Sequence, residues 1–401
     1  MKRALPLFLL ILSLALSPTA ARAQQVIPVE DLGVTYEFGS QVTFNARIQS
    51  ELEVKEVMLF VTPVGEQAIM RSVPLDSARE VHYTFRAADL GLRPFTQNRF
   101  HFLVVLQSGE ILPSTSFTFR YEDNRFQWQM LLHPDFEVYW YGRSAAFGQE
   151  ILDVARQGLK SAAAILAADP PAPIRIYAYD SSADLQSALH LNQPWIVGHA
   201  APDLGQMYLY IPTGPEQRLE IERQVPHEIM HFLQYRVAAE NLRRQPVWLM
   251  EGMASLAELY PNPEYQRHLR AAADRRELLS MVSLCHAFPR ETFGAYLAYA
   301  QSASFVRFLY QSYGSDGLKK LMEQYNNGLG CEEGLTAALG SSLSQFEYRW
   351  KQEILGLDAG NLVLRNLSPY LLILLLVMLP TTLVFFPYTR NRLPKHDEPL
   401  P

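Results

Sequence analysis

The chain has 401 residues, 48% of them apolar and 19% charged, so it can bury a substantial core and is not mainly disordered. A formal net charge of −6 leaves no large basic surface, which argues against a nucleic-acid partner. Two cysteines exclude a disulfide-framed scaffold and a zinc site built from a cysteine cluster.

The N-terminus has the pattern of a secretory signal peptide. Residues 1–3 are a basic start, residues 4–16 are apolar, and Ala21-Arg22-Ala23 is a small-x-small cleavage site. We therefore expect a signal peptide over residues 1–23 and a mature start at Gln24, with an uncleaved anchor as the alternative.

Residues 24–122 alternate between apolar and polar side chains in short runs. Examples are Val42 to Ile48 and Phe100 to Leu106, and turn residues such as Phe38-Gly39-Ser40 and Ser108-Gly109 separate such runs. Short alternating strands with regular turns predict an antiparallel sandwich, immunoglobulin-like or fibronectin-like. No chemistry is visible there, and the partner of this domain is unknown.

Residues 123–357 have a different pattern, with strands first and helices afterwards. Phe136 to Tyr141, Ile174 to Tyr179 and Met207 to Ile211 read as strands, and the chain is mostly helical from Glu216 to about Leu355. This order predicts an α+β domain with a helical C-terminal lobe.

The residues that indicate chemistry begin with His227-Glu228-Ile229-Met230-His231, an HExxH motif. On a helix, residues i and i+4 share one face, so both imidazoles can reach one metal ion. Glu228 is placed to hold the water that the metal activates. Pro226, directly before the motif, predicts either the first turn of the helix or a kink in a longer helix that begins near Glu216.

A third ligand is offered by Glu251, within Trp248-Leu249-Met250-Glu251-Gly252, after nineteen intervening residues that follow His231. Two histidines, one glutamate and one water make the open tetrahedral arrangement of a catalytic zinc site.

HExxH followed by this W-L-x-E-G-x-A segment resembles the gluzincins, specifically the peptidase MA-like metallohydrolases related to aminopeptidase N. The resemblance covers about residues 123–357. It implies Zn²⁺ bound by His227, His231 and Glu251, with Glu228 as general base. It also implies that Glu258 is a carboxylate behind the ligands that orients one of the histidines.

Tyr299, in Tyr299-Ala300-Gln301-Ser302-Ala303, is similar to the tyrosine of aminopeptidase N relatives that donates a hydrogen bond to the tetrahedral intermediate. Tyr296, three residues earlier on the same expected helix, stays open as the alternative donor, and a packing role is the alternative for Tyr299.

One family feature is missing. Aminopeptidase N enzymes bind the substrate amine through a G-x-M-E-N segment, and the comparable Gly198-His199-Ala200-Ala201-Pro202 contains no glutamate. The choice between endopeptidase and aminopeptidase therefore stays open, as does the choice between a Cys285–Cys331 disulfide and two separate buried thiols.

The C-terminus predicts a membrane span, because no charged residue occurs between Arg365 and Arg390. We expect a linker over residues 358–366, a transmembrane helix over 367–388 and a cytoplasmic tail over 389–401, whose Arg390, Arg392 and Lys395 would stay inside.

Together these features predict a multidomain fold: an N-terminal all-β immunoglobulin-like sandwich, an α+β gluzincin-type metallopeptidase domain and one transmembrane helix. The predicted function is a zinc metallopeptidase acting on a peptide or protein substrate. Its predicted location is the cell membrane, as a single-pass type I protein with an extracellular catalytic domain. The alternative is an inactive cell-surface binding protein that keeps the metallopeptidase fold.

Overall fold

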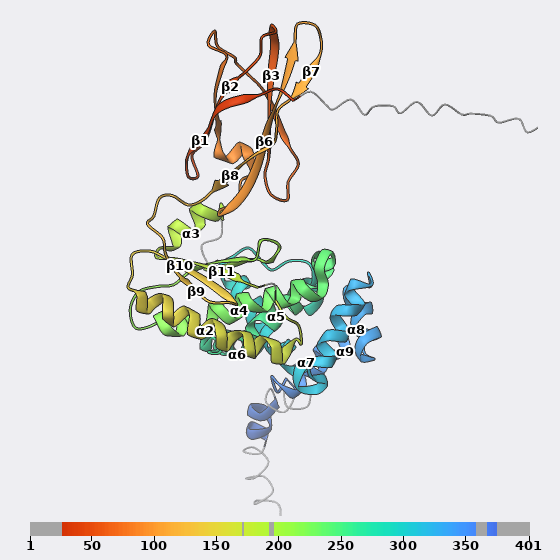
Figure 1. The fold of residues 1–401 in the computed structure, drawn as a ribbon. Coiled ribbons are helices and arrows are strands. Elements are labelled where there is room, and N and C mark those ends of the chain that lie inside the picture. The colour runs from red at the N-terminus through yellow and green to blue at the C-terminus, as the bar shows by residue number, and fades with distance from the viewer. Residues whose placement is uncertain (1–25, 171, 192–195, 358–366, 375–401) are drawn as a thin grey trace, which may run out of the picture. The chain divides into compact units, whose positions relative to one another are not determined.

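The computed structural model describes residues 26–170, 172–191, 196–357 and 367–374 (Figure 1). The predicted signal peptide (1–23), linker (358–366) and tail (389–401) lie outside these residues. The chain divides into two compact units, Met1–Arg125 and Phe126–Pro401, each with its own sheets and core.

The first unit is built from antiparallel strands whose alternating side chains face a shared core. Phe44 lies between the two sheets, with its ring centroid 5.1 Å from Phe100 and 5.5 Å from Phe119. A short helix, α1 (Ala87–Leu90), precedes the longest strand. One sheet has the order β1 (Val29–Glu37), β2 (Gln41–Ile48), β5 (Glu80–Arg86); the other has the order β4 (Ile69–Val73), β3 (Val54–Thr62), β6 (Thr96–Leu106), β7 (Ile111–Pro113), with β8 (Phe117–Tyr121) also paired to β6.

The second unit opens with a five-stranded sheet of order β12-β13-β11-β10-β9. Its middle strands, β10 (Phe136–Trp140), β11 (Ile174–Tyr179) and β13 (Gln206–Tyr210), run parallel, and the outer strands β9 (Gln129–Leu132) and β12 (Gly198–Ala201) run antiparallel to their neighbours. The central strand β11 is almost entirely buried, as expected for a strand covered on both faces.

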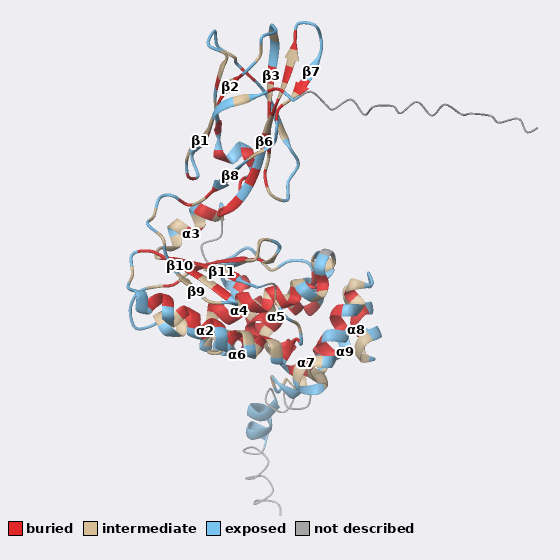
Figure 2. Cartoon of the chain, in the orientation of Figure 1, coloured by how far each residue is buried: buried red, intermediate tan, exposed pale blue. Residues whose placement is uncertain are grey.

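Helices follow the sheet in the chain. Among them α4 is buried on several sides, because α2, α5 and strand β12 all pack against it (Figure 2). The helices of this unit are α2 (Ala145–Ile165), α3 (Ser182–Leu189), α4 (Gln217–Ala238), α5 (Val247–Ala257), α6 (Pro263–Arg275), α7 (Thr292–Asn326), α8 (Cys331–Leu339) and α9 (Leu343–Glu353), with the 3₁₀ turns η1 (Pro202–Leu204), η2 (Ala239–Arg244) and η3 (Met281–Cys285).

Pro226 lies inside α4, so the HExxH helix is the longer of the two predicted forms. A proline has no N–H to donate, which leaves the carbonyl four residues earlier, that of Glu222, without its usual helical partner. That carbonyl accepts a hydrogen bond from the backbone N–H of Leu259 at 3.0 Å. The proline thus creates an attachment point for the residue that follows Glu258, just beyond the end of α5.

Helix α5 also packs closely on α7. A Cβ atom at Gly252 would lie 2.5 Å from the Ser302 carbonyl oxygen and 2.4 Å from Val306 Cγ2. Only glycine permits this approach, and the neighbouring Glu251 is held in position by the same contact.

Cys285 in η3 and Cys331 at the start of α8 form a disulfide that closes a 46-residue separation. On the chain-entropy model such a loop stabilises the fold by about 4 kcal/mol. Trp248 of α5 donates its Nε1–H to Cys331 Sγ at 3.3 Å. The disulfide therefore supports the helix that carries Glu251.

The predicted fold class and location are wrong where they require a membrane span. Within residues 26–357, short gaps aside, and 367–374, no helix is both long and apolar enough to cross a bilayer. The described part of the predicted span is the helical segment 367–374, about 12 Å long at 1.5 Å per residue, against ~30 Å of hydrocarbon. Its remainder, residues 375–388, lies outside the described residues. The described fold is a mixed α/β arrangement with sheets toward the N-terminus and helices toward the C-terminus.

Candidate metal centre

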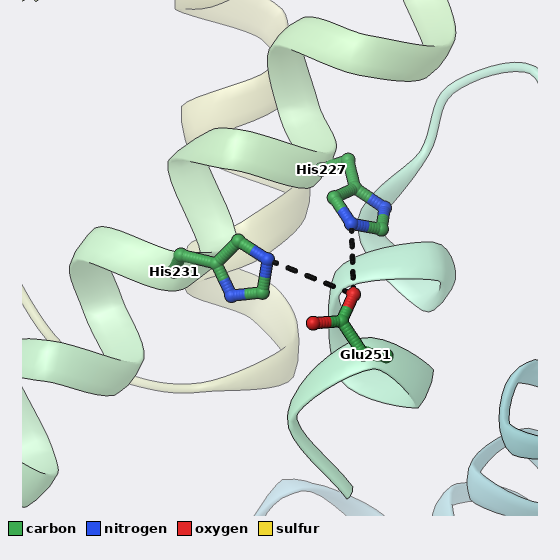
Figure 3. Close-up of side chains that lie close together, drawn as sticks. All are labelled: His227, His231 and Glu251. Carbon is green, nitrogen blue, oxygen red and sulfur yellow. Dashed lines mark ion pairs between the residues drawn. The ribbon is translucent and has the colours of Figure 1, made fainter. Parts of the chain in front are cut away.

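Two helices bring three ligand side chains together (Figure 3). His227 and His231 project from one face of α4, and Glu251 projects from α5. Glu251 Oε2 lies 3.4 Å from His227 Nε2 and 3.9 Å from His231 Nε2. One ligand atom from each of the three residues lies within 4.8 Å of the others, a separation that one metal ion can bridge.

The far nitrogen of each imidazole is fixed by a buried partner. His227 Nδ1 donates to Glu258 Oε1 at 3.1 Å, and His231 Nδ1 donates to Gln234 Oε1 at 2.8 Å. The Gln234 amide in turn donates Nε2–H to the carbonyl of Met250 at 2.8 Å, directly before Glu251. These bonds make each Nδ1 a donor, so that in a neutral imidazole Nε2 is the atom that can bind a metal ion.

The electrostatics of the cluster favour a cation. Burial opposes a charged imidazole, but hydrogen bonds to Glu251 and Glu258 raise the pKa of His227 well above its usual value. Burial likewise opposes a charged Glu251, and the hydrogen bond from His227 and the charge of His231 lower the pKa of that carboxyl. Positive charge is therefore stabilised at this point of the interior, which is what a bound metal ion supplies.

Glu228 lies beside the histidines with only 6% of its surface exposed, and it faces the edge strand β12. A Cβ atom at Gly198 would lie 2.5 Å from Glu228 Oε1, so a larger residue there would displace the carboxylate from its present position. The side chain lines a cavity of about 340 Å³ together with His227 and Tyr299. The carboxylate is thus available to a group bound in that cavity.

The two candidate tyrosines of α7 differ in their surroundings. Tyr299 has its ring centroid 6.5 Å from that of His227, and Phe288 packs edge-on against it at 5.0 Å. The Glu251 carboxylate and burial raise the pKa of Tyr299 well above its usual value, so its hydroxyl stays protonated. Tyr296 also lines the cavity, but it is 37% exposed and packs near His268.

The structure therefore gathers every residue selected from the sequence: His227, Glu228, His231, Glu251, Glu258 and Tyr299. It adds Gln234, which the sequence analysis missed. Its signal was its place three residues after His231, since residues i and i+3 are neighbours on a helix. A polar residue at that spacing, fully buried as Gln234 is, needs a partner.

A sheet followed by helices that hold a His-His-Glu cluster is the arrangement that the resemblance to the peptidase MA-like proteins predicts. Residues 154–356 match the family model of the Peptidase MA superfamily, which spans more than half of the chain. The chain therefore belongs to the Peptidase MA superfamily, and the resemblance predicted from HExxH and Glu251 is confirmed. No curated relative matches the sequence.

Solved structures give weaker similarities. An aminopeptidase N family protein from Idiomarina loihiensis is 12% identical, with 81% of this chain and 73% of that chain covered and a TM-score of 0.38. OgpA from Akkermansia muciniphila is 18% identical over 25% of this chain and 32% of its own, with a TM-score of 0.21. A β-1,3-glucan binding domain of carbohydrate-binding module family 56 is 17% identical over 23% and 99%, with a TM-score of 0.18. At such scores, membership rests on the family model.

Proposed function

We propose that this protein is a zinc peptidase that hydrolyses peptide bonds with Glu228 as its general base. The observation that carries the proposal is the convergence of His227, His231 and Glu251 on one point, with Glu228 beside it at the wall of a cavity. Membership in the Peptidase MA superfamily supports peptides as the class of substrate.

The three ligand residues fit zinc by number and chemistry. Two ligand atoms, each about 2.1 Å from a tetrahedral zinc ion, lie about 3.4 Å apart. The separation of His227 Nε2 and Glu251 Oε2 equals this distance at 3.4 Å, and that of His231 Nε2 and Glu251 Oε2 exceeds it slightly at 3.9 Å. Two imidazoles and one carboxylate also leave a fourth position for water or substrate.

Zinc bound there supplies Lewis acidity, which polarises a carbonyl and makes water nucleophilic near neutral pH. Glu228 accepts the proton of the attacking water and passes it to the departing amine. Tyr299 donates its hydroxyl proton in a hydrogen bond to the oxyanion that develops on the scissile carbonyl. Glu258 and Gln234 hold the two imidazoles in the ligating tautomer.

Replacement of Tyr299 by phenylalanine is expected to lower kcat by about 10²–10³, the usual cost of removing one oxyanion donor. The ring and its packing against Phe288 remain, so zinc content and melting temperature should stay near wild type. Steady-state kinetics on a cleaved peptide, with metal analysis of the same preparation, measure this.

Tyr296→Phe is the matched control, because it removes a hydroxyl from the same helix and the same cavity. Its kcat should stay within a few-fold of wild type. A large loss in Tyr296→Phe alone would transfer the donor role to Tyr296, and no loss in either variant would leave the oxyanion to another group.

The decisive experiment on the proposal uses the full-length wild-type protein. It should purify with, or take up, about one zinc ion per chain and cleave members of a peptide library. A chelator should stop cleavage, and added zinc should restore it. A protein that binds zinc yet cleaves nothing would be the binding protein of the alternative hypothesis, and one that binds no metal would refute the site.

A further inference from the structure

The cavity at the metal centre extends well beyond the groups that perform the chemistry. From His227 and Glu228 it continues toward the start of α4, where Glu220 and Arg223 line it. Arg223 precedes His227 by four residues, which is about one helical turn or ~6 Å along the axis. A substrate group held beside Arg223 would therefore lie within one or two residues of the bond being cleaved.

Arg223 is held in place by neighbours on its own helix. Its Nη1 donates to Glu220 Oε1 at 2.6 Å, and the other oxygen of Glu220 accepts from Gln224 Nε2 at 3.1 Å. Each oxygen of Glu220 thus already accepts one hydrogen bond. Within the described part of the chain neither Nη2 nor the buried Nε of Arg223 has a hydrogen-bond partner, although the side chain is only 20% exposed.

We propose that Arg223 is a specificity-determining residue that binds a carboxylate of the peptide substrate. This inference rests on the proposed peptidase function. A guanidinium presents a planar fork of N–H donors that matches a carboxylate in a bidentate pair, and Glu220 orients that fork before substrate arrives. The carboxylate is either an acidic side chain next to the scissile bond or the C-terminus of a short peptide.

The opposite preference, for a basic side chain, would need Glu220 as the acceptor. An ammonium group that bound there would share the Glu220 oxygens with Arg223 and Gln224, and the positive charge of Arg223, whose Nη1 lies 2.6 Å from Glu220 Oε1, would repel it. A substrate carboxylate is instead attracted by the positive charge of Arg223 and can accept from Nη2, which has no partner in the described part of the chain. The charge of Arg223 also reaches Tyr265, which lines the same cavity. Burial and the Glu258 and Glu251 carboxylates raise the pKa of Tyr265, and the Arg223 guanidinium lowers it.

The test compares peptides that differ by one group, on full-length, zinc-loaded protein. One series carries Glu or Gln at each position flanking the cleaved bond, and the other carries a free or an amidated C-terminus. For wild type, one of the two series should show a 10- to 100-fold higher kcat/KM for the carboxylate member, the usual range for a charged hydrogen bond. The series that responds identifies the source of the carboxylate.

In Arg223→Gln the ratio of kcat/KM between the carboxylate peptide and its neutral partner should fall to about one, whatever the basal rate. Arg223→Lys should retain part of this preference. Arg218→Gln is the matched control, since Arg218 lies on α4 but pairs with Glu222 and Glu150 outside the cavity wall. Calorimetric titration of the same peptide pairs into metal-free protein reads the preference without turnover.

Three results would overturn the inference and leave the peptidase function standing. In the first, wild type cleaves peptides with no preference for the carboxylate member, and in the second it prefers Lys or Arg at that position. The third result is a carboxylate preference that survives in Arg223→Gln. If zinc-loaded wild type cleaves no peptide at all, the proposed function and this inference fail together.

Discussion

Replacement of His231 by alanine is expected to cost the protein its metal ion and, with it, all measurable peptidase activity. In the proposed zinc site His231 is one of three ligands, and its removal leaves only His227 and Glu251. Replacing a group that merely supports a ligand typically lowers metal affinity 10- to 100-fold, so loss of the ligand itself should cost more than about 100-fold. The melting temperature should also lose its dependence on zinc, because only a bound ion stabilises the folded state.

Zinc content by elemental analysis and melting curves with zinc or with chelator measure both effects. His286→Ala is the control, since His286 is exposed and lies outside the ligand cluster. A His231→Ala protein that retained one zinc ion per chain and a zinc-dependent melting temperature would show that the ion is held elsewhere.

The proximity of the three candidate ligands could be predicted from the sequence because its signals are local. The i, i+4 spacing of His227 and His231 fixes a shared helix face without knowledge of the rest of the fold. Glu251 could be predicted as the third candidate ligand for a related reason, since it lies early on the next α-helix. The structure adds how the two helices are joined: Pro226 frees the Glu222 carbonyl for Leu259, and Gly252 lets α5 approach α7.

Residues whose role depends on long-range contacts were harder to find. Gln234 is distinguished from other glutamines by its hydrogen bonds to His231 and to the Met250 carbonyl. Arg223 looks like an ordinary charged residue of an amphipathic helix until the cavity beside it is known. The state of Cys285 and Cys331 likewise depended on η3 and the start of α8 meeting in space.

The membrane span fails for a different reason. The prediction rested on an uncharged, apolar run over residues 367–388, and a run of this kind shows hydrophobicity without showing the length of a helix. The helical part among the described residues, 367–374, covers less than half of the hydrocarbon thickness. In the first unit, by contrast, alternation is itself the structural signal, because side chains of a strand point alternately to opposite faces.

Replacement of Glu228 by glutamine is expected to lower kcat by about 10²–10⁴ while zinc stays bound. Glutamine has nearly the same size and shape, so it fits the space beside Gly198 that the carboxylate occupies. It cannot accept the proton of the attacking water, and the loss of a general base typically costs this factor. Because Glu228 is not among the three ligands, metal content should equal that of wild type.

Glu222→Gln is the matched control: the same exchange on the same helix, at a residue that pairs with Arg218 and does not line the cavity. Its kcat should stay near that of wild type. If Glu228→Gln also lost zinc, Glu228 would be part of the metal site itself. If it kept both zinc and full activity, the proton would be taken by another group at the cavity wall. Glu258 would be the next residue to replace, because its Oε2 is buried without a hydrogen-bond partner within the described chain.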